Sequence, residues 1–172
     1  MRIATTLAGI ALLAGSAMAT AAGPRATARL VDGTGAPKGM ATLVQTDAGV
    51  AIKLAGTGLP AGAHGIHVHM VGACDGPDFT TAGSHWNPTS HQHGTENAAG
   101  PHSGDLPNLQ VDARGRTKFT TTIAGARLTD GDKPMIDADG AALVIHAAPD
   151  DYKTDPSGNS GARIACGIVK AR

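Results

Sequence analysis

The sequence predicts an all-β fold, an antiparallel sandwich or barrel of about eight short strands with two long loops. Glycine and proline supply 24 and 10 of the 172 residues, and this density leaves few stretches long enough for a helix. After the N-terminal segment, no stretch keeps the spacing of about 3.6 residues between apolar positions that marks an amphipathic helix. The length suits one domain of ordinary size.

The first strands are identified by the alternation of apolar and polar side chains, which places successive residues on opposite faces of a sheet. Residues 26–31 alternate in this way, and residues 32–35 form a turn. Residues 40–46 and 50–54 follow, and Gly49 between them fits the turn of a hairpin. The chain therefore begins with three consecutive strands, of which the last two form a hairpin.

The remaining strands are separated by two long irregular tracts. Strands are expected at residues 65–70, 110–112, 117–123, 141–147 and 163–170. The tract 71–109 is rich in Gly, Pro, His and Asn, and a second irregular stretch covers residues 149–160. A long loop inside a compact domain is either functional or disordered, so these tracts are where a site is expected.

The N-terminal segment has the pattern of a cleaved secretory signal. Arg2 provides positive charge, residues 3–15 are apolar but too short to span a bilayer, and Ala17-Met18-Ala19 fits a cleavage site. An uncleaved anchor or a first core helix is the alternative. We expect a signal peptide at residues 1–19, with its end between residues 19 and 22, a single domain at residues 24–172, and export to the periplasm.

The chain has two cysteines, Cys74 and Cys166. In an exported protein such a pair predicts one disulfide, and two free buried thiols are the alternative. The bridge would close a loop of about 90 residues and contribute at most about 4–5 kcal/mol, by the entropy that it removes from the unfolded chain. It would also tie the tract 71–109 to the last predicted strand.

Charge and composition exclude two broad classes of protein. Lys plus Arg and Asp plus Glu number 14 each, so the net charge is zero, whereas a general nucleic-acid binder needs a basic face. Hydrophobic residues make up 41% of the chain, which argues against intrinsic disorder. With two Phe, one Trp and one Tyr, the core must consist mainly of aliphatic side chains.

Histidine is the most unusually distributed residue, because seven of the eight lie between His64 and His102. His67 and His69 lie two residues apart on a predicted strand, so both imidazoles leave the same face and can chelate one metal. His146 ends another apolar strand, where a hydrogen-bonded core histidine is the alternative. These three residues form a candidate strand-borne ligand group that consists only of histidines.

A second candidate group lies in the long tract, where His85, His93 and His102 are followed by Asp105. Loop histidines are usually solvated, but four ligand-type residues within 21 positions are harder to dismiss. Three imidazoles and one carboxylate match tetrahedral zinc. The mixed nitrogen and oxygen donors suit neither calcium nor Cu(I) alone.

Four motifs resemble the copper-zinc superoxide dismutase family, in order and spacing, over residues 26–169. The segment GAHGIHVH (62–69) resembles the copper-binding strand of the family, and AGSHWNP (82–88) resembles its bridging-histidine segment. HG (93–94) and HSGDL (102–106) resemble the zinc loop, and SGARIACG (160–167) the C-terminal signature. The resemblance implies an eight-stranded Greek-key β-barrel, or flattened sandwich, of the exported bacterial type.

The resemblance also implies a role for each matching residue. The copper ligands would be His67, His69, His85 and His146. The zinc ligands would be His85, His93, His102 and Asp105, with His85 bridging the two metals. Cys74 and Cys166 match the family disulfide, and Arg163 matches the arginine that guides the anion to copper.

Three further residues are given supporting or surface roles by the resemblance. Asp150 would link zinc-side His93 to a copper-side histidine, with His67 and His69 both left open as its partner. His64 would support the loops rather than bind metal. His91 has no counterpart in the family and is interpreted as a surface residue.

The activity implied by the resemblance is the conversion of superoxide and protons to dioxygen and hydrogen peroxide. One copper per subunit would cycle between Cu(II) and Cu(I), whereas one zinc per subunit, which has no redox chemistry, would hold His85. His85 would gain a proton when its bond to copper breaks and would then give the proton up. Lys153 would either add positive potential or simply be solvated.

Two other functions stay open, a copper-delivery protein on the same barrel and a structural β-sandwich that mediates interactions. Arg163 and the complete ligand set favour the enzyme over both. We expect superoxide as the substrate, no nucleic-acid partner, and no membrane partner after signal cleavage. The compact loops define no interface, so the choice between a monomer and a homodimer stays open.

Overall fold

The computed structural model describes residues 23–172. The predicted signal peptide at residues 1–19 lies outside the described residues, so it stays a prediction. The described part of the chain has no helix that is long and apolar enough to cross a membrane. Its one helix is a short 3₁₀ turn, η1 (Thr80–Ala82).

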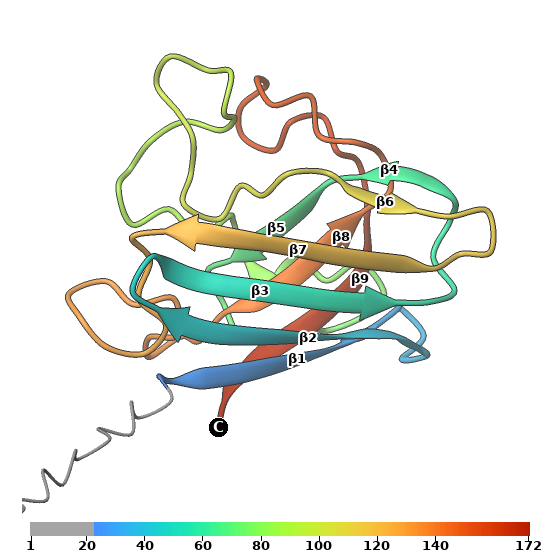
Figure 1. The fold of residues 1–172 in the computed structure, drawn as a ribbon. Helices are drawn as coiled ribbons and strands as arrows, with labels where there is room; N and C mark the ends of the chain where they lie inside the picture. Colours follow the sequence, from blue (N-terminus) through green and yellow to red (C-terminus); the bar gives the residue numbers. More distant parts are fainter. Residues whose placement is uncertain (1–22) are drawn as a thin grey trace, which may run out of the picture.

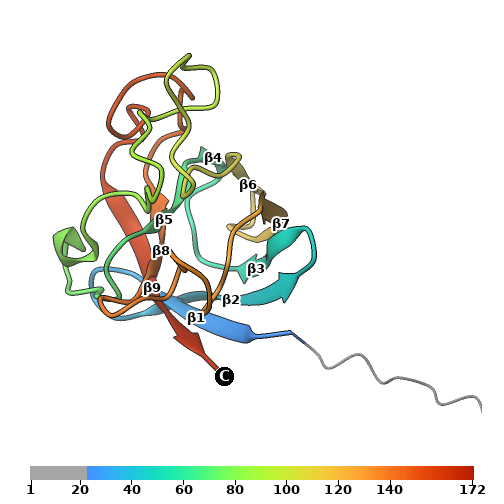
Figure 2. The same cartoon turned by 90° about the vertical axis from the view of Figure 1, so that its left-hand side faces the viewer.

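The strands form a strongly curled antiparallel sheet, as the sequence predicts. They are β1 (Arg25–Val31), β2 (Pro37–Thr46), β3 (Gly49–Gly56), β4 (Gly62–His64), β5 (Ile66–His69), β6 (Leu109–Val111), β7 (Thr117–Ala124), β8 (Ala142–His146) and β9 (Arg163–Ala171). Seven of them pair in the order β5-β8-β9-β1-β2-β3-β7, and β4 and β6 form a separate two-stranded ribbon. Figure 1 shows the four strands β1, β2, β3 and β7 in front of β5, β8 and β9. Figure 2 shows the sheet curling around its interior.

The structure has nine strands where about eight are expected, because it contains a strand that the sequence analysis does not predict. The predicted strand at residues 65–70 corresponds to β5, which pairs with β8, whereas β4 lies just before it and pairs with β6. Gly65 separates the two strands, and its N–H donates to Ala148 O over 2.9 Å. A Cβ there would lie 2.9 Å from the Cβ of Ser160, so this close approach requires glycine.

The core fills the inside of the curl and follows the predicted alternation. Along β1, Ala26, Ala28 and Leu30 are fully buried against the aliphatic residues of β2, β3 and β8. Strand β8 is buried at every position, because Leu143 and Ile145 face the core while its other side is also covered. Both sides of β8 are therefore removed from water.

The cover on the outer side of β8 is the loop that contains the disulfide. Ala142 and Val144 pack there against Phe79 and Cys166. Cys74 and Cys166 are bonded, with their Cα atoms 5.7 Å apart, which confirms the predicted bridge. The disulfide thereby fixes this loop over β8 and β9, next to the histidines of the strand-borne group.

Candidate metal centre

The strand-borne histidines leave the sheet on the side opposite the core. His67 and His69 of β5 pair with Val144 and Ala142 of β8, so they share the outer side of the sheet with those residues. His146 continues the same side of β8 at its end. All three imidazoles are buried, because two loops cover this side of the sheet.

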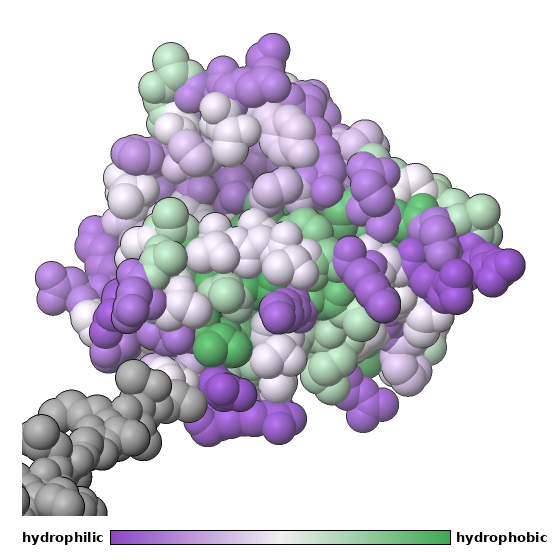
Figure 3. Space-filling view, in the orientation of Figure 1, coloured by the Kyte–Doolittle hydropathy of each residue, from purple (hydrophilic) through white to green (hydrophobic). Residues whose placement is uncertain are grey.

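The two covering loops are the predicted irregular tracts 71–109 and 149–160. Figure 1 places both at the same end of the molecule, and Figure 3 shows hydrophilic residues gathered there. The first loop returns to β5 through isolated bridges between His69 and His85 and between His67 and Asp105. These contacts bring residues of the loop-borne group against the strand-borne histidines.

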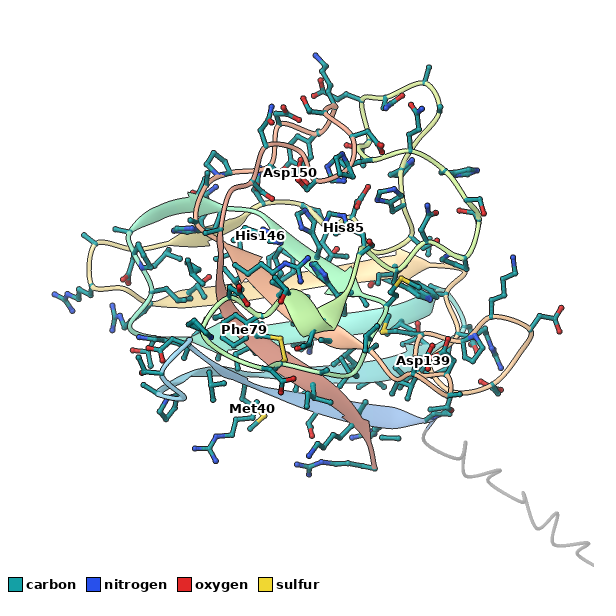
Figure 4. All side chains as sticks on the ribbon, turned by 180° about the vertical axis from the view of Figure 1, so that it is seen from behind. Met40, Phe79, His85, Asp139, His146 and Asp150 are labelled. Carbon is teal, nitrogen blue, oxygen red and sulfur yellow. A yellow bond between two sulfur atoms is a disulfide. The ribbon has the colours of Figure 1, made fainter. Side chains whose placement is uncertain are left out.

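The side chains converge into the two groups that the sequence predicts. His67, His69, His85 and His146 place one ligand atom each within 4.8 Å of one another, and so do His85, His93, His102 and Asp105. His85 belongs to both groups. Seen from behind, His85 and His146 lie together beneath the loop that carries Asp150 (Figure 4).

The unpaired nitrogens of the strand-borne group show that these residues fit a metal ion. In the described part of the chain, His67 Nδ1, His69 Nε2 and His146 Nε2 are buried without a hydrogen-bond partner. Buried polar atoms of this kind are costly unless something satisfies them. A metal coordinated by these three nitrogens and His85 would satisfy them.

The loop-borne group is arranged around one carboxylate oxygen. Asp105 Oδ1 lies 2.8 Å from His85 Nδ1, 3.0 Å from His93 Nδ1 and 3.2 Å from His102 Nδ1. Three Nδ1 atoms and one carboxylate oxygen match the donors of a tetrahedral zinc site. Because His85 uses Nδ1 here, its Nε2 is left for the strand-borne group.

Outer hydrogen bonds fix the orientation of most of these imidazoles. Asp150 reaches both groups, since Oδ2 lies 2.7 Å from His67 Nε2 and Oδ1 lies 3.0 Å from His93 Nε2. The structure thus places His67, not His69, against Asp150. His69 Nδ1 instead lies 2.9 Å from Gly83 O, and His146 Nδ1 lies 3.2 Å from Gly161 O.

Three residues that support this arrangement were missed by sequence reasoning. The side chain of Asn108 exchanges two hydrogen bonds with the main chain of Asp150, at 2.9 and 2.8 Å. The hydroxyl of Tyr152 accepts from Asn108 N at 2.8 Å. Asp155 Oδ1 accepts from His93 N at 2.6 Å. These contacts join residues 42 to 62 positions apart, and no local pattern signals them.

The protonation equilibria of the metal-free site favour neutral strand-borne imidazoles. Burial, reinforced by neighbouring imidazoles, lowers the pKa of His69 to about 2 and of His146 to about 3. Burial lowers the pKa of His85 to about 4 despite its hydrogen bond with Asp105. Metal ligands must be deprotonated, so these imidazoles are ready to coordinate at neutral pH.

His93 has the opposite protonation behaviour. Burial disfavours its charged form, but hydrogen bonds with Asp105 and Asp150 outweigh this and raise its pKa to about 9. The same contacts hold the pKa of both carboxyl groups well below the usual range, although burial opposes this. A metal ion that binds His93 through Nδ1 at neutral pH would therefore compete with a proton.

Arg163 lies beside the strand-borne group at the start of β9, where it pairs with His146. Its Nη1 donates to Phe79 O and its Nη2 to Gly83 O, each over 2.7 Å. Gly83 O also contacts His69, so one carbonyl links the arginine to a candidate ligand. Burial lowers the pKa of Arg163, but a guanidinium stays charged at any physiological pH.

The remaining candidate residues lie outside both ligand groups. His64 lies 2.8 Å from His146 O through Nδ1 and 2.9 Å from Pro60 O through Nε2, as a supporting residue would. His91 is exposed. Lys153 forms an ion pair with Glu96 at 3.0 Å, which offsets the positive potential that it could add.

Comparison with known proteins identifies the family. The family description "Copper/zinc superoxide dismutase" matches residues 37–169. The chain is 46% identical to the Cu-Zn superoxide dismutase 1 of Aquifex aeolicus, over 83% of this chain and 86% of the relative. It is 38% identical to the Cu-Zn superoxide dismutase of Caulobacter vibrioides, over 84% and 85%.

A solved structure supports the same assignment at the level of the fold. The crystal structure of a superoxide dismutase-like protein from Bacillus subtilis superposes with a TM-score of 0.80 and 40% identity, over 83% of this chain and 96% of that one. Both sequence relatives and this structure cover more than four fifths of this chain. The chain belongs to the copper/zinc superoxide dismutase family.

Proposed function

We propose that this chain is an exported superoxide dismutase that holds copper in the strand-borne group and zinc in the loop-borne group. The observation that carries the proposal is that His85 belongs to both groups, with Nδ1 directed to Asp105 and Nε2 left for the other group. A protein that only stored metal would not need one imidazole shared between two unlike sites. When bound, copper supplies the one-electron couple that alternately oxidises and reduces superoxide.

Arg163 binds and orients the anion in this proposal. Its guanidinium is held by two carbonyls, so its direction is fixed before superoxide arrives. A fixed positive charge beside a buried site attracts a small anion and raises its local concentration. The free donors of the guanidinium fork can then hold the anion next to the strand-borne group.

His85 handles the proton. Its Nδ1 is committed to the loop-borne group, so Nε2 is the atom that can carry a proton between turnovers. The proton on Nε2 is delivered to the superoxide that is being reduced, and a second proton comes from water. Two superoxide anions and two protons then give one dioxygen and one hydrogen peroxide.

Pulse radiolysis of the mature chain tests this function. Protein loaded with one copper and one zinc should accelerate superoxide decay in a copper-dependent way, and metal-free protein should not. No acceleration with both metals bound would refute the enzyme and leave metal carriage on the same barrel as the function.

Export is proposed from the N-terminal pattern together with the disulfide. Arg2, the apolar residues 3–15 and the small residues that follow fit a secretory signal, and disulfides persist in oxidising compartments such as the periplasm. N-terminal sequencing of protein from a periplasmic fraction should find a mature chain that begins between residues 20 and 23. Recovery of an intact Met1 from the cytoplasm would refute export.

A further inference from the structure

One ligand of the loop-borne group lacks the outer support that the other histidines have. His67, His69, His93 and His146 each direct their second ring nitrogen to an oxygen at 2.7–3.2 Å. Among the described residues His102 Nε2 has no such partner, and Asp155 Oδ1 lies 3.9 Å away. His102 is 8% exposed, and its Nε2, unlike the unpaired nitrogens of His67, His69 and His146, is not fully buried, so solvent reaches it.

A pocket of about 360 Å³ opens at the surface beside His102. Its lining includes Met70, His85, His91, His102 and Asp155. The side chains of the other two loop-borne ligands, His93 and Asp105, are only 0% and 3% exposed and do not line it. His85 and His102 are therefore the ligands that a small solute in this pocket can reach.

The charges around the centre favour different ions on its two sides. Arg163, with its fixed positive charge, lies beside the strand-borne group and does not line the pocket. The pocket instead carries the carboxylate of Asp155, which is half exposed and faces His102. A divalent cation is attracted to the Asp155 side and repelled from the Arg163 side, whereas an anion behaves in the opposite way.

We propose that this pocket is the route by which zinc reaches and leaves its site, and that Asp155 controls the exchange. The carboxylate attracts the incoming cation. With zinc bound through His102 Nδ1, the carboxylate of Asp155 accepts a hydrogen bond from the N–H of His102 Nε2 after a small movement and holds that ring in place. This inference rests on the proposed assignment of zinc to the loop-borne group.

Filling the pocket tests the route. Met70→Trp should slow zinc association and dissociation by the same factor, about tenfold, while the Kd stays within about twofold, because an obstruction changes rates and not affinity. Met40→Trp is the matched control, since both methionines are 45% exposed and Met40 lies far from His85 in Figure 4. Rates would be followed on copper-loaded protein with zinc and a colorimetric chelator.

Removing the charge tests the role of Asp155. Asp155→Asn keeps an oxygen that can accept from His93 N but loses the attraction for the cation. We expect an affinity for zinc about tenfold weaker, with a faster dissociation rate and an unchanged affinity for copper, and partial recovery in Asp155→Glu. Asp139 is an exposed residue far from the metal centre, so Asp139→Asn should leave the affinities for zinc and copper unchanged.

The outcomes separate this inference from the proposed function. If Met70→Trp exchanges zinc as fast as Met40→Trp does, or if Asp155→Asn retains zinc as tightly as the wild type, the route is overturned and the ligand assignment stands. If the wild-type chain binds no zinc at the loop-borne group, the assignment and the route both fail.

Discussion

The two halves of the metal centre are held in place by different kinds of structure. His67, His69 and His146 belong to β5 and β8, which pair residue by residue at one end of the seven-stranded sheet. His93, His102 and Asp105 lie on one loop, and their positions depend on contacts with Asp150 and Asp155 from a second loop. Under the proposed assignment, copper ligands on paired strands should tolerate changes in the loops better than zinc ligands that are held by a few side-chain contacts.

The largest difference between the effects on zinc affinity and on copper affinity is expected from Gly158→Ala. Gly158 has a φ of +64°, and a Cβ there would lie 1.9 Å from Asp150 Oδ1 and 2.6 Å from His93 Nε2. The methyl group must push the carboxylate away, so zinc affinity should fall about a hundredfold while copper affinity changes much less. Competition titration of both metals measures this.

Gly125→Ala is the matched control for that experiment. Gly125 has a φ of +68° but open space where a Cβ would lie, so the substitution introduces the same backbone strain without the collision. Equal losses of zinc affinity in the two variants would show that strain, and not the displaced carboxylate, is responsible.

Asp150→Asn should produce a smaller difference between the loss of zinc affinity and the loss of copper affinity than Gly158→Ala does. One of the two carboxylate contacts, to His67 or to His93, is lost. We expect zinc affinity to fall about tenfold or somewhat more, and copper affinity to fall less because β5 still fixes His67. Competition titration measures both affinities. An equal loss of copper affinity and zinc affinity would contradict the expected difference between the strand side and the loop side.

Arg163→Ala tests the strand side without removing a ligand. Activity should fall about tenfold, from the loss of attraction and orientation, while copper content falls little. Superoxide decay would be measured at full copper loading, next to metal analysis of the same sample. Unchanged activity at full loading would remove Arg163 from the proposed mechanism.

In the metal-free chain, the histidines of the two halves should make the free energy of unfolding depend on pH in opposite directions. On the strand side, His69 and His146 have folded pKa values of about 2 and 3, below the unfolded value of about 6.5, so stability falls as pH drops from about 6.5 through these values. His93, with a folded pKa of about 9, contributes fully below about 6.5, and its contribution is lost as pH rises toward 9. Urea unfolding should find a maximum near pH 6.5. A stability that rises steadily from about pH 4.5 to pH 9 would contradict this.

The smallest effect is expected from deleting single hydroxyl groups. Tyr152→Phe removes the acceptor for Asn108 N and should lower the free energy of unfolding by about 1 kcal/mol. Thr117→Val on β7 removes a buried hydroxyl that has no partner in the described structure, and it should cost nothing. Urea unfolding of the two variants measures the loss of free energy of unfolding in the loop and in the strand. A larger loss for Thr117→Val than for Tyr152→Phe would contradict this prediction.

The sequence predicts the strand half of the centre better than the loop half. The spacing of two residues between His67 and His69 is enough to place both imidazoles on one face, and the structure agrees. The grouping of His85, His93, His102 and Asp105 followed from their ligand types and from the family motifs, because no periodicity governs a loop. The partner of Asp150 stayed open for the same reason.

The parts that could not be predicted depend on contacts between distant segments. The break between β4 and β5 at Gly65 follows from its hydrogen bond to Ala148 and its closeness to Ser160, which both lie between β8 and β9. Asn108 and Asp155 act on residues 42 and 62 positions away. Local sequence patterns predict turns and the face of a strand on which a side chain lies. They do not predict which loops contact each other in the folded chain.

The loop that carries His93, His102 and Asp105 also covers one end of the sheet. β5 is the outermost strand on its side, and its backbone groups are paired with the loop, through Val68 N to Gly104 O at 2.9 Å and Trp86 N to Val68 O at 2.7 Å. An outermost strand with free backbone groups is a template on which another chain can add a strand. Detachment of this loop would therefore offer β5 to neighbouring chains. Under the proposed assignment of zinc, metal supply and resistance to aggregation would depend on the same backbone contacts.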